Sequence, residues 1–232
     1  MFSFKAFDIS DARSAMKVGT DGVLLGAWAD VAHDARILDL GTGSGIIALM
    51  AAQRNRDAHI VGVDIDEGAV ADARDNVLAS PWASRIDIVR CDIAHYATDE
   101  PFDHIISNPP YFISSLHSPS EQRTTARHTS SLDFSTLVAA ASRLLRPEGR
   151  LSVVLPTAEA RRFRFVAFGR LHLRRLTDVA TKEGGEPQRT LMEFCLTTAT
   201  PQPRCSAITI HNADGSYSGE YRRLTDDFYL KF

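Results

Sequence analysis

The fold is decided by a stretch near the start of the chain, which reads Ala35-Arg36-Ile37-Leu38-Asp39-Leu40-Gly41-Thr42-Gly43-Ser44-Gly45. Its first six residues are mostly apolar and predict a buried strand. The glycines predict a tight turn, and the apolar run from Ile46 to Gln53 predicts a helix directly after it. A strand, a glycine-rich turn and a helix in this order are typical of open α/β folds, in which the helix N-terminus offers unpaired amides to a ligand.

The glycine-rich turn departs from the dinucleotide-binding fingerprint in two places. That fingerprint, G-x-G-x-x-G, requires a glycine where this chain has Ile46. Asp39 also stands just before the first glycine, where a carboxylate would repel a pyrophosphate but can orient water or a ligand ammonium. Both departures favour S-adenosylmethionine over a dinucleotide as the ligand. A purely structural role for the turn is the alternative.

Three more predicted strands each end close to a polar side chain. These strands span His59–Asp64, Ile86–Arg90 and Phe102–Ser107. Asp64 ends the first of them, Asp92 follows the second and Asn108 follows the third. Each polar residue falls at the carboxyl end of its strand, the edge at which ligands of open α/β sheets bind. An acid at Asp64 can accept hydrogen bonds from both hydroxyls of an adenosine ribose, whereas Asp92 either reaches the exocyclic amine of the adenine or caps a turn.

The tetrapeptide Asn108-Pro109-Pro110-Tyr111 lies where the last of these strands stops. Proline lacks a ladder donor and fixes φ, so two prolines end the strand and leave a rigid loop. The Asn108 carboxamide has both an acceptor and a donor, the Pro109 carbonyl is free, and Tyr111 adds an aromatic face. These groups suit a planar amino group such as N6 of adenine, so Asn108, Pro109 and Tyr111 are the predicted catalytic residues. The alternative is a Pro-Pro loop that merely ends a strand.

The sequence also resembles a known family. The motifs D-L-G-T-G-S-G, V-D-I-D, C-D-I and S-N-P-P-Y resemble those of the class I S-adenosylmethionine-dependent methyltransferases that modify amino groups. The leader F-K-A-F-D-I-S-D-A-R-S-A-M-K-V-G-T-D-G-V-L-L-G-A-W, the segment S-P-W-A-S-R-I and the tail Y-S-G-E-Y-R-R-L-T-D-D-F-Y resemble the bacterial tRNA1(Val) adenine N6-methyltransferases. This resemblance runs through nearly the whole chain. It implies a Rossmann-like α/β fold with a seven-stranded, mostly parallel, doubly wound sheet and an antiparallel edge. It also implies N6-methylation of the adenine immediately 3′ of the anticodon in a valine tRNA.

The residues by themselves also allow other functions. Asn-Pro-Pro-Tyr would equally hold the side-chain amide of a glutamine, which would make a protein the substrate of an N5-methylation. The chain could also be a non-catalytic nucleotide- or RNA-binding module, although the intact tetrapeptide counts against that function. The missing glycine at position 46 counts against a nucleotide-dependent oxidoreductase.

The N-terminal segment contains a second candidate for ligand contact, Lys17-Val18-Gly19-Thr20-Asp21-Gly22. Thr20 could cap the helix that follows, and the two glycines allow close backbone approach to a ligand; a plain turn into a helix is the alternative. We expect a single methyltransferase domain in which residues 1–34 cover the cofactor, 35–200 form the catalytic core and 201–232 are a C-terminal extension. The predicted cofactor-binding residues are Lys17, Gly19, Thr20, Asp39, Gly41, Gly43, Asp64, Ile65, Asp92, Ile93 and Asn108.

Two segments are candidates for holding RNA. The polar stretch from Phe112 to Leu132 is either a flap that holds base and phosphate or a solvated surface loop. Arginines also crowd the next predicted helix and its exit, either as a tRNA-backbone surface or as a solvated helix face. These arginines are Arg161, Arg162, Arg164, Arg170, Arg174 and Arg175. The predicted RNA contacts are Tyr111, Arg123, Arg127, His128, Arg161, Arg162 and Arg164.

The composition sets limits on function. The 232 residues carry a net charge of −3, which argues against a protein that coats nucleic acid non-specifically. The three cysteines follow no pattern, so neither a disulfide framework nor a metal site is predicted. The N-terminus does not resemble a signal peptide, and no apolar run approaches membrane-spanning length. We expect a cytoplasmic, monomeric protein with tRNA as its partner and no membrane contact.

Overall fold

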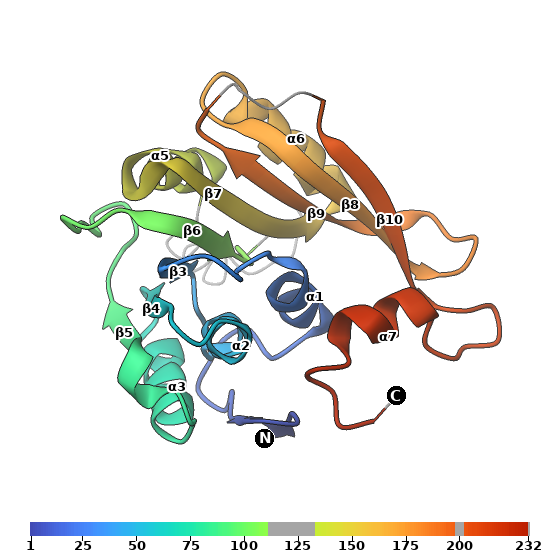
Figure 1. Cartoon of the computed structure of the whole chain (residues 1–232), viewed down its shortest axis with the longest axis horizontal. Helices are drawn as coiled ribbons and strands as arrows, with labels where there is room; N and C mark the ends of the chain where they lie inside the picture. Colours follow the sequence, from blue (N-terminus) through green and yellow to red (C-terminus); the bar gives the residue numbers. More distant parts are fainter. Residues whose placement is uncertain (111–132, 198–201, 232) are drawn as a thin grey trace, which may run out of the picture.

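An eight-stranded sheet runs through the centre of the molecule (Figure 1). The computed structural model describes residues 1–110, 133–197 and 202–231. The strand order is β10-β8-β9-β7-β6-β3-β4-β5. The strands span β3 (Arg36–Leu40), β4 (His59–Asp64), β5 (Ile86–Arg90), β6 (Phe102–Ser107), β7 (Leu145–Pro156), β8 (His172–Lys182), β9 (Pro187–Cys195) and β10 (Arg204–His211). Only β9 runs antiparallel to its neighbours in this sheet, which makes the sheet mostly parallel, as expected. Unlike the expected antiparallel edge, β9 lies between β7 and β8, and the edge strand β10 pairs with β8 in parallel.

Helices cover both faces of the sheet (Figure 1). They are α1 (Thr20–Trp28), α2 (Ile46–Arg54), α3 (Glu67–Leu78), α5 (Phe134–Leu144), α6 (Thr157–Ala167) and α7 (Gly219–Thr225), with a short 3-10 helix at Ala83–Arg85. One hydrophobic cluster joins α1, α2 and α7 to one face, and a second joins α5 and α6 to the other. A small hairpin of β1 (Phe2–Ser3) and β2 (Asp8–Ile9) precedes α1. The α/β architecture predicted from the sequence is confirmed.

The predicted strand count of seven is too low by one, because β8 is absent from the predicted elements. Arg174 and Arg175 were predicted to lie at the exit of the preceding helix. The structure instead places them inside strand β8. Both lie beside buried Glu193 of β9, at nitrogen–oxygen distances of 3.6 and 3.2 Å. The Arg175 guanidinium also lies 3.6 Å from the centre of the Trp28 ring. These contacts compensate both charges, so neither arginine is a free cation.

The predicted cap of α1 is also wrong. Thr20 is the first residue of the helix, and Gly19 takes the capping position in an extended conformation without a side-chain hydrogen bond. Helix α3 is capped by Asp66, whose carboxylate accepts a hydrogen bond from the amide of Ala69 at 2.7 Å.

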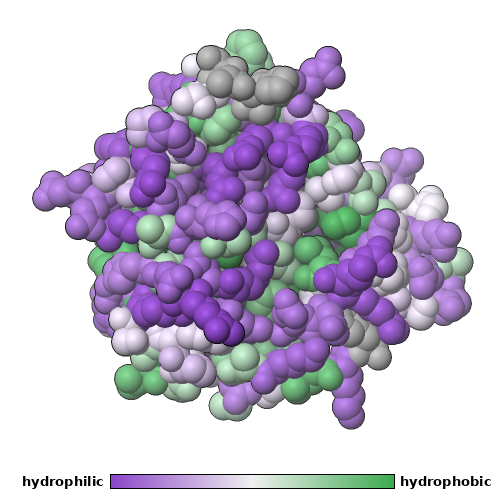
Figure 2. Space-filling view, in the orientation of Figure 1, coloured by the Kyte–Doolittle hydropathy of each residue, from purple (hydrophilic) through white to green (hydrophobic). Residues whose placement is uncertain are grey.

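The protein surface is mainly hydrophilic on the face shown in Figure 2, with apolar residues in separate small areas. Among the described residues, no helix is long and apolar enough to cross a membrane.

A buried polar network ties together the chain segments at the amino ends of β3, β6 and β7. His104 is fully buried; its Nδ1 donates to Asp34 Oδ2 at 2.9 Å, and its Nε2 lies 2.8 Å from Ser152 Oγ. Arg150 donates to Asp34 Oδ1 at 2.6 Å. Burial pushes the pKa of Asp34 upward, but the hydrogen bond and charge of His104, with the charge of Arg150, bring this pKa below its ordinary value of 3.8. The carboxylate therefore stabilises the fold in its ionised form.

Replacing Asp34 by asparagine should lower the free energy of unfolding by about 3 kcal/mol at neutral pH, because it leaves the largely buried Arg150 without its close charge partner. A lowered pKa in the folded state means that this stability is present above pH 4 and is lost as the pH falls through the folded-state value. Urea denaturation at several pH values should therefore show the two proteins converging below pH 4. Asp30→Asn is the control, since Asp30 is 60% exposed and 3.9 Å from Arg150. Equal stabilities of the Asp34 variant and the parent at pH 7 would contradict a stabilising role.

Candidate cofactor and substrate site

A cavity of about 400 Å³ opens at the carboxyl edge of the parallel strands. It is lined by the glycine-rich turn after β3, by the ends of β4, β5 and β6, and by residues 14–19 of the N-terminal segment. Its size and its mixture of apolar walls with a few polar groups are typical of small-molecule sites. The strand-end residues predicted to meet at this edge do so.

The glycine-rich turn forms one wall of the cavity. Gly41, Gly43 and Gly45 have φ angles of 73°, 56° and 85°, which only glycine adopts without strain. A Cβ built on Gly41 or Gly43 would meet no atom within 4 Å. The turn therefore presents bare backbone to the cavity, and a ligand can approach it closely.

Asp39 supports this turn from beneath. It is fully buried, and one of its oxygens accepts hydrogen bonds from the Thr42 hydroxyl at 2.6 Å and the Ala48 amide at 3.0 Å. The other oxygen has no partner among the described residues. Burial raises the pKa of this carboxyl to about 7, and the nearby charge of Asp64 adds to the effect. Asp39 is not among the described residues that line the cavity, so its visible role is to hold the turn.

Asp64 is the last residue of β4 and lines the cavity beside the glycine-rich turn. Its Oδ2 accepts a hydrogen bond from the amide of Gly43 and its Oδ1 accepts one from the amide of Asp66, both at 2.9 Å. Each oxygen keeps a second lone pair, which leaves two acceptor sites for ligand hydroxyls. The structure thus orients the carboxylate predicted to hold a ribose.

Asp92 caps a turn and also lines the cavity. Its Oδ1 accepts a hydrogen bond from the amide of Ala94 at 2.9 Å, as in the turn that was the alternative. Asp92 nevertheless lines the cavity together with Ile65 and Ile93. Ile65 is 49% exposed and Ile93 is buried, so the cavity has apolar side chains near the acid that suit the faces of a purine ring.

Asn108 stands where β6 ends and also lines the cavity. The preceding residue, Ser107, donates its hydroxyl to the carbonyl of Leu40 at 2.8 Å, which holds the end of β6 beside the end of β3. Asn108 Oδ1 is buried and has no hydrogen-bond partner among the described residues. Pro110 lines the cavity, whereas Pro109 is buried. A buried carboxamide oxygen without a partner is costly, and a bound donor would remove that cost.

The N-terminal segment covers the cavity from the side. Lys17 and Gly19 line it, but Thr20 does not. Lys17 Nζ donates to the carbonyl of Asp11 at 2.5 Å. A Cβ on Gly22 would lie 3.4 Å from Ile46 Cγ2 and 3.9 Å from Asn108 Nδ2, so this glycine lets α1 pack close to the site.

The residue that anchors this covering segment was not predicted from the sequence. Asp72 of α3 is almost fully buried and accepts hydrogen bonds from the amides of Arg13 and Ser14 at 2.8 and 2.7 Å. It also accepts from the Arg13 guanidinium at 2.7 Å and the Ser14 hydroxyl at 2.8 Å. The only signal in the sequence is an acid beside Ala73 on the apolar face of a helix.

The predicted RNA residues that the structure describes do not line this cavity. Tyr111, Arg123, Arg127 and His128 lie outside the described residues. Arg161 and Arg164 of α6 line a separate groove, and Arg162 makes an ion pair with Glu159. The described residues contain no cluster that could hold a metal ion.

Comparison with known proteins identifies the family. Residues 13–163 match the family model described as Methyltransferase small domain. The chain is 50% identical to the tRNA1(Val) (adenine(37)-N6)-methyltransferase of Phocaeicola vulgatus, over 99% of this chain and 97% of the relative. It is 47% identical to the protein of the same name from Aeromonas salmonicida, with the same coverage.

The chain belongs to the tRNA1(Val) (adenine(37)-N6)-methyltransferase family. The resemblance seen in the sequence is therefore confirmed. A solved structure described as a predicted O-methyltransferase of Agrobacterium tumefaciens shares the fold, with a TM-score of 0.70 and 21% identity over 90% of this chain and 96% of that one. Another, TrmN from Thermus thermophilus, gives a TM-score of 0.52 with 25% identity over 70% of this chain and 44% of that one.

Replacing Asp72 by alanine should weaken the binding of S-adenosylmethionine about tenfold. The variant loosens the segment where Arg13 and Ser14 were anchored, and restoring order equivalent to about one residue on binding costs about 1–2 kcal/mol. Titration calorimetry would measure the affinity. Asp75→Ala is the matched control, because Asp75 is the exposed partner of the same arginine. Ser14→Ala, which removes one donor only, should have an intermediate effect; an unchanged affinity in the Asp72 variant would show that the anchor is irrelevant to binding.

Proposed function

We propose that this protein transfers a methyl group from S-adenosylmethionine to N6 of adenine 37 in a valine tRNA. The main support is the environment of Asn108. Its buried carboxamide oxygen has no partner among the described residues, and the residue lines a cavity with a glycine-rich wall. The names of relatives that match 99% of the chain support the same reaction and substrate. A tRNA substrate also implies a cytoplasmic location.

The residues of the cavity fit S-adenosylmethionine. Asp64 would hold the ribose hydroxyls, and Asp92 with Ile65 and Ile93 would hold the adenine. Gly41 and Gly43 leave room for the amino-acid portion, and the buried carboxyl of Asp39 beneath them would hold the turn that faces it. When bound, this cofactor supplies a methyl group that is strongly activated by a positively charged sulfur. Residues 1–34 would cover it through Lys17 and Gly19.

Asn108 would then orient the acceptor. The lone pair of an aromatic amine is delocalised into the ring, which makes the amine a weak nucleophile. A hydrogen bond from the amine to Asn108 Oδ1, with a second to the carbonyl of Pro109, favours a pyramidal nitrogen and aims its lone pair. Positioning of this kind can supply much of the rate enhancement. No general base need act first, because the amine proton becomes acidic only after methylation.

The target adenine must leave its stack to enter the cavity, which an unpaired purine of an anticodon loop can do at modest cost. In this proposal Tyr111 stacks on the base. A glutamine side chain would satisfy the same carboxamide, so purified tRNA should be compared with a purified peptide-release factor as methyl acceptors. Methylation of the release factor and not of the tRNA would overturn the proposal.

Replacing Asp64 by alanine should weaken S-adenosylmethionine binding by about 1.5–3 kcal/mol, because two ribose hydroxyls lose a charged acceptor. The variant also frees the amide of Gly43, so the glycine-rich turn itself becomes less ordered. Calorimetric titration tests this assignment, and an unchanged dissociation constant would rule it out.

Replacing Asn108 by alanine should leave cofactor affinity within a few-fold of the parent but lower turnover by about 100-fold or more, as loss of positioning does. Asn108→Asp is the matched variant, which keeps an acceptor oxygen and should retain part of the activity. Single-turnover methylation of tRNA separates the chemical step from binding. Near-normal turnover in the alanine variant would refute the role of Asn108.

A further inference from the structure

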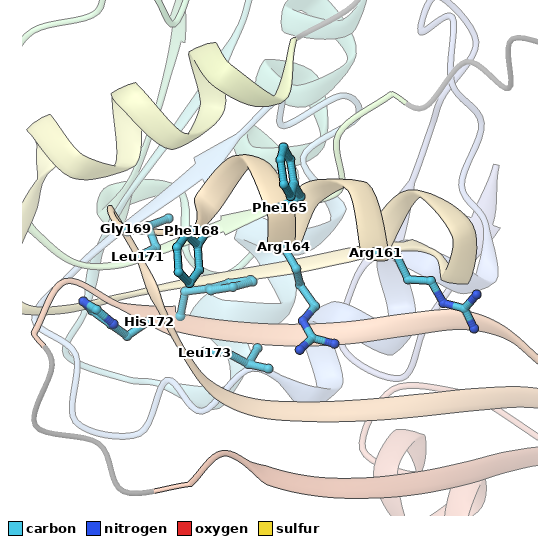
Figure 3. Close-up of a pocket in the computed structure, with 9 residues that line it drawn as sticks. Arg161, Arg164, Phe165, Phe168, Gly169, Leu171, His172 and Leu173 are labelled. Atoms are coloured by element: carbon cyan, nitrogen blue, oxygen red, sulfur yellow. The ribbon is translucent and has the colours of Figure 1, made fainter.

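A groove of about 580 Å³ beside α6 carries two exposed aromatic rings that the fold does not use (Figure 3). Phe165 and Phe168 are 85% and 87% exposed, the most exposed aromatic side chains among the described residues. The floor of the groove includes Leu171 and Phe194, both buried. Single exposed apolar residues are common, but two large rings at the rim of one groove mark a surface that binds something.

The two rings share a helix face with two arginines. Arg161, Arg164, Phe165 and Phe168 follow the spacing i, i+3, i+4, i+7, which places them along one side of α6 and its C-terminal cap. The opposite side of the helix packs Ala160, Phe163 and Ala167 into the core. We call these four exposed residues the α6 platform. In Figure 3 the side chains of Arg161, Arg164 and Phe168 follow one another in this order along α6, and the Phe165 ring points away from the Arg164 guanidinium.

The charges of the platform are uncompensated within the described part of the chain. Neither Arg161 nor Arg164 has a carboxylate within ion-pair distance among those residues, whereas their neighbour Arg162 pairs with both oxygens of Glu159 at 3.0 Å. Two free cations beside two aromatic faces match the chemistry of unpaired RNA, which offers phosphates to the arginines and base faces to the rings.

We propose that the α6 platform binds unpaired nucleotides of the substrate tRNA that lie outside the target base. This inference rests on the proposed function. Helix α6 begins directly after β7, at the carboxyl edge where the cavity opens, and runs back towards the amino edge, where His172 begins β8. The groove lies towards that amino edge, since it is lined by His172, Leu173 and Phe194. The platform would therefore hold a part of the tRNA away from the cavity, so that it sets affinity while the cavity carries out methylation.

The test compares full-length variants in tRNA binding and in methylation kinetics. Phe165→Ala/Phe168→Ala should weaken tRNA binding and raise KM for tRNA about tenfold or more, the loss expected when bases no longer stack. The affinity for S-adenosylmethionine should stay at the parent value. Leu78→Ala is the matched control, since Leu78 is a 78% exposed apolar residue on α3 and should leave KM unchanged.

The salt dependence of tRNA binding tests the two arginines separately. Arg161→Gln/Arg164→Gln should flatten the plot of log affinity against log salt by about 1.4–1.8, because each phosphate contact contributes about 0.7–0.9. The single variants Arg161→Gln and Arg162→Gln each remove one positive charge from the same helix. Arg162 is already paired with Glu159, so the change in salt slope for Arg162→Gln should be less than half that for Arg161→Gln.

Three results would overturn the α6 platform as an RNA site. One is parent-like KM and tRNA affinity in the double phenylalanine variant. Another is an equal salt slope for the parent and the double arginine variant. The third is a dimeric parent and a monomeric phenylalanine variant in sedimentation, with tRNA affinity unchanged, which would make the groove an interface between copies. Failure of the proposed function would give a different result, in which the parent binds tRNA without methylating adenine 37. The comparison of tRNA affinities between parent and variants would still show whether the α6 platform binds RNA.

Discussion

The site depends on the hydrogen bond from the Gly43 amide to the Asp64 carboxylate. This bond joins the turn after β3 to the end of β4, and the left-handed conformation of Gly43 makes it possible. The amides of Gly41 and Thr42 reach the carbonyl of Val63 on the same strand, at 2.8 and 3.0 Å. Together these bonds hold the bare backbone of the turn and the carboxylate in one fixed arrangement before any ligand arrives, which reduces the ordering cost of binding.

The same edge contains polar atoms that the described residues leave without partners. Oδ1 of Asp39 and Oδ1 of Asn108 are both buried and unbonded there. Such atoms cost stability, and proteins retain them where a ligand completes the bonding. The two atoms belong to the ends of β3 and β6, which pair as adjacent strands and are also joined by the hydrogen bond from the Ser107 hydroxyl to the Leu40 carbonyl. An amine bound in the cavity would satisfy the Asn108 oxygen, whereas Asp39 does not line the cavity and supports the turn from beneath.

The parts of this site that the sequence predicted are those encoded locally. Apolar runs marked β3 to β6, and the residues just beyond them, Asp64, Asp92 and Asn108, meet at one edge because parallel strands bring their ends together. Asp72 could not be predicted, because its partners Arg13 and Ser14 lie almost sixty residues away in the chain. Strand β8 was missed for a similar reason: Glu193, which compensates its arginines, lies on another strand. Arg162 differs from Arg161 and Arg164 because it forms an ion pair with Glu159.

The central claim is that this chain methylates N6 of adenine 37 in a valine tRNA. The most direct measurement is nucleoside and oligonucleotide mass spectrometry of that tRNA, isolated from cells with and without the gene and from deletion cells supplied with the parent or the Asn108→Ala protein. The account predicts N6-methyladenosine at position 37 only where the parent protein is present. The same modification level in the deletion cells, or full restoration by the alanine variant, would contradict it.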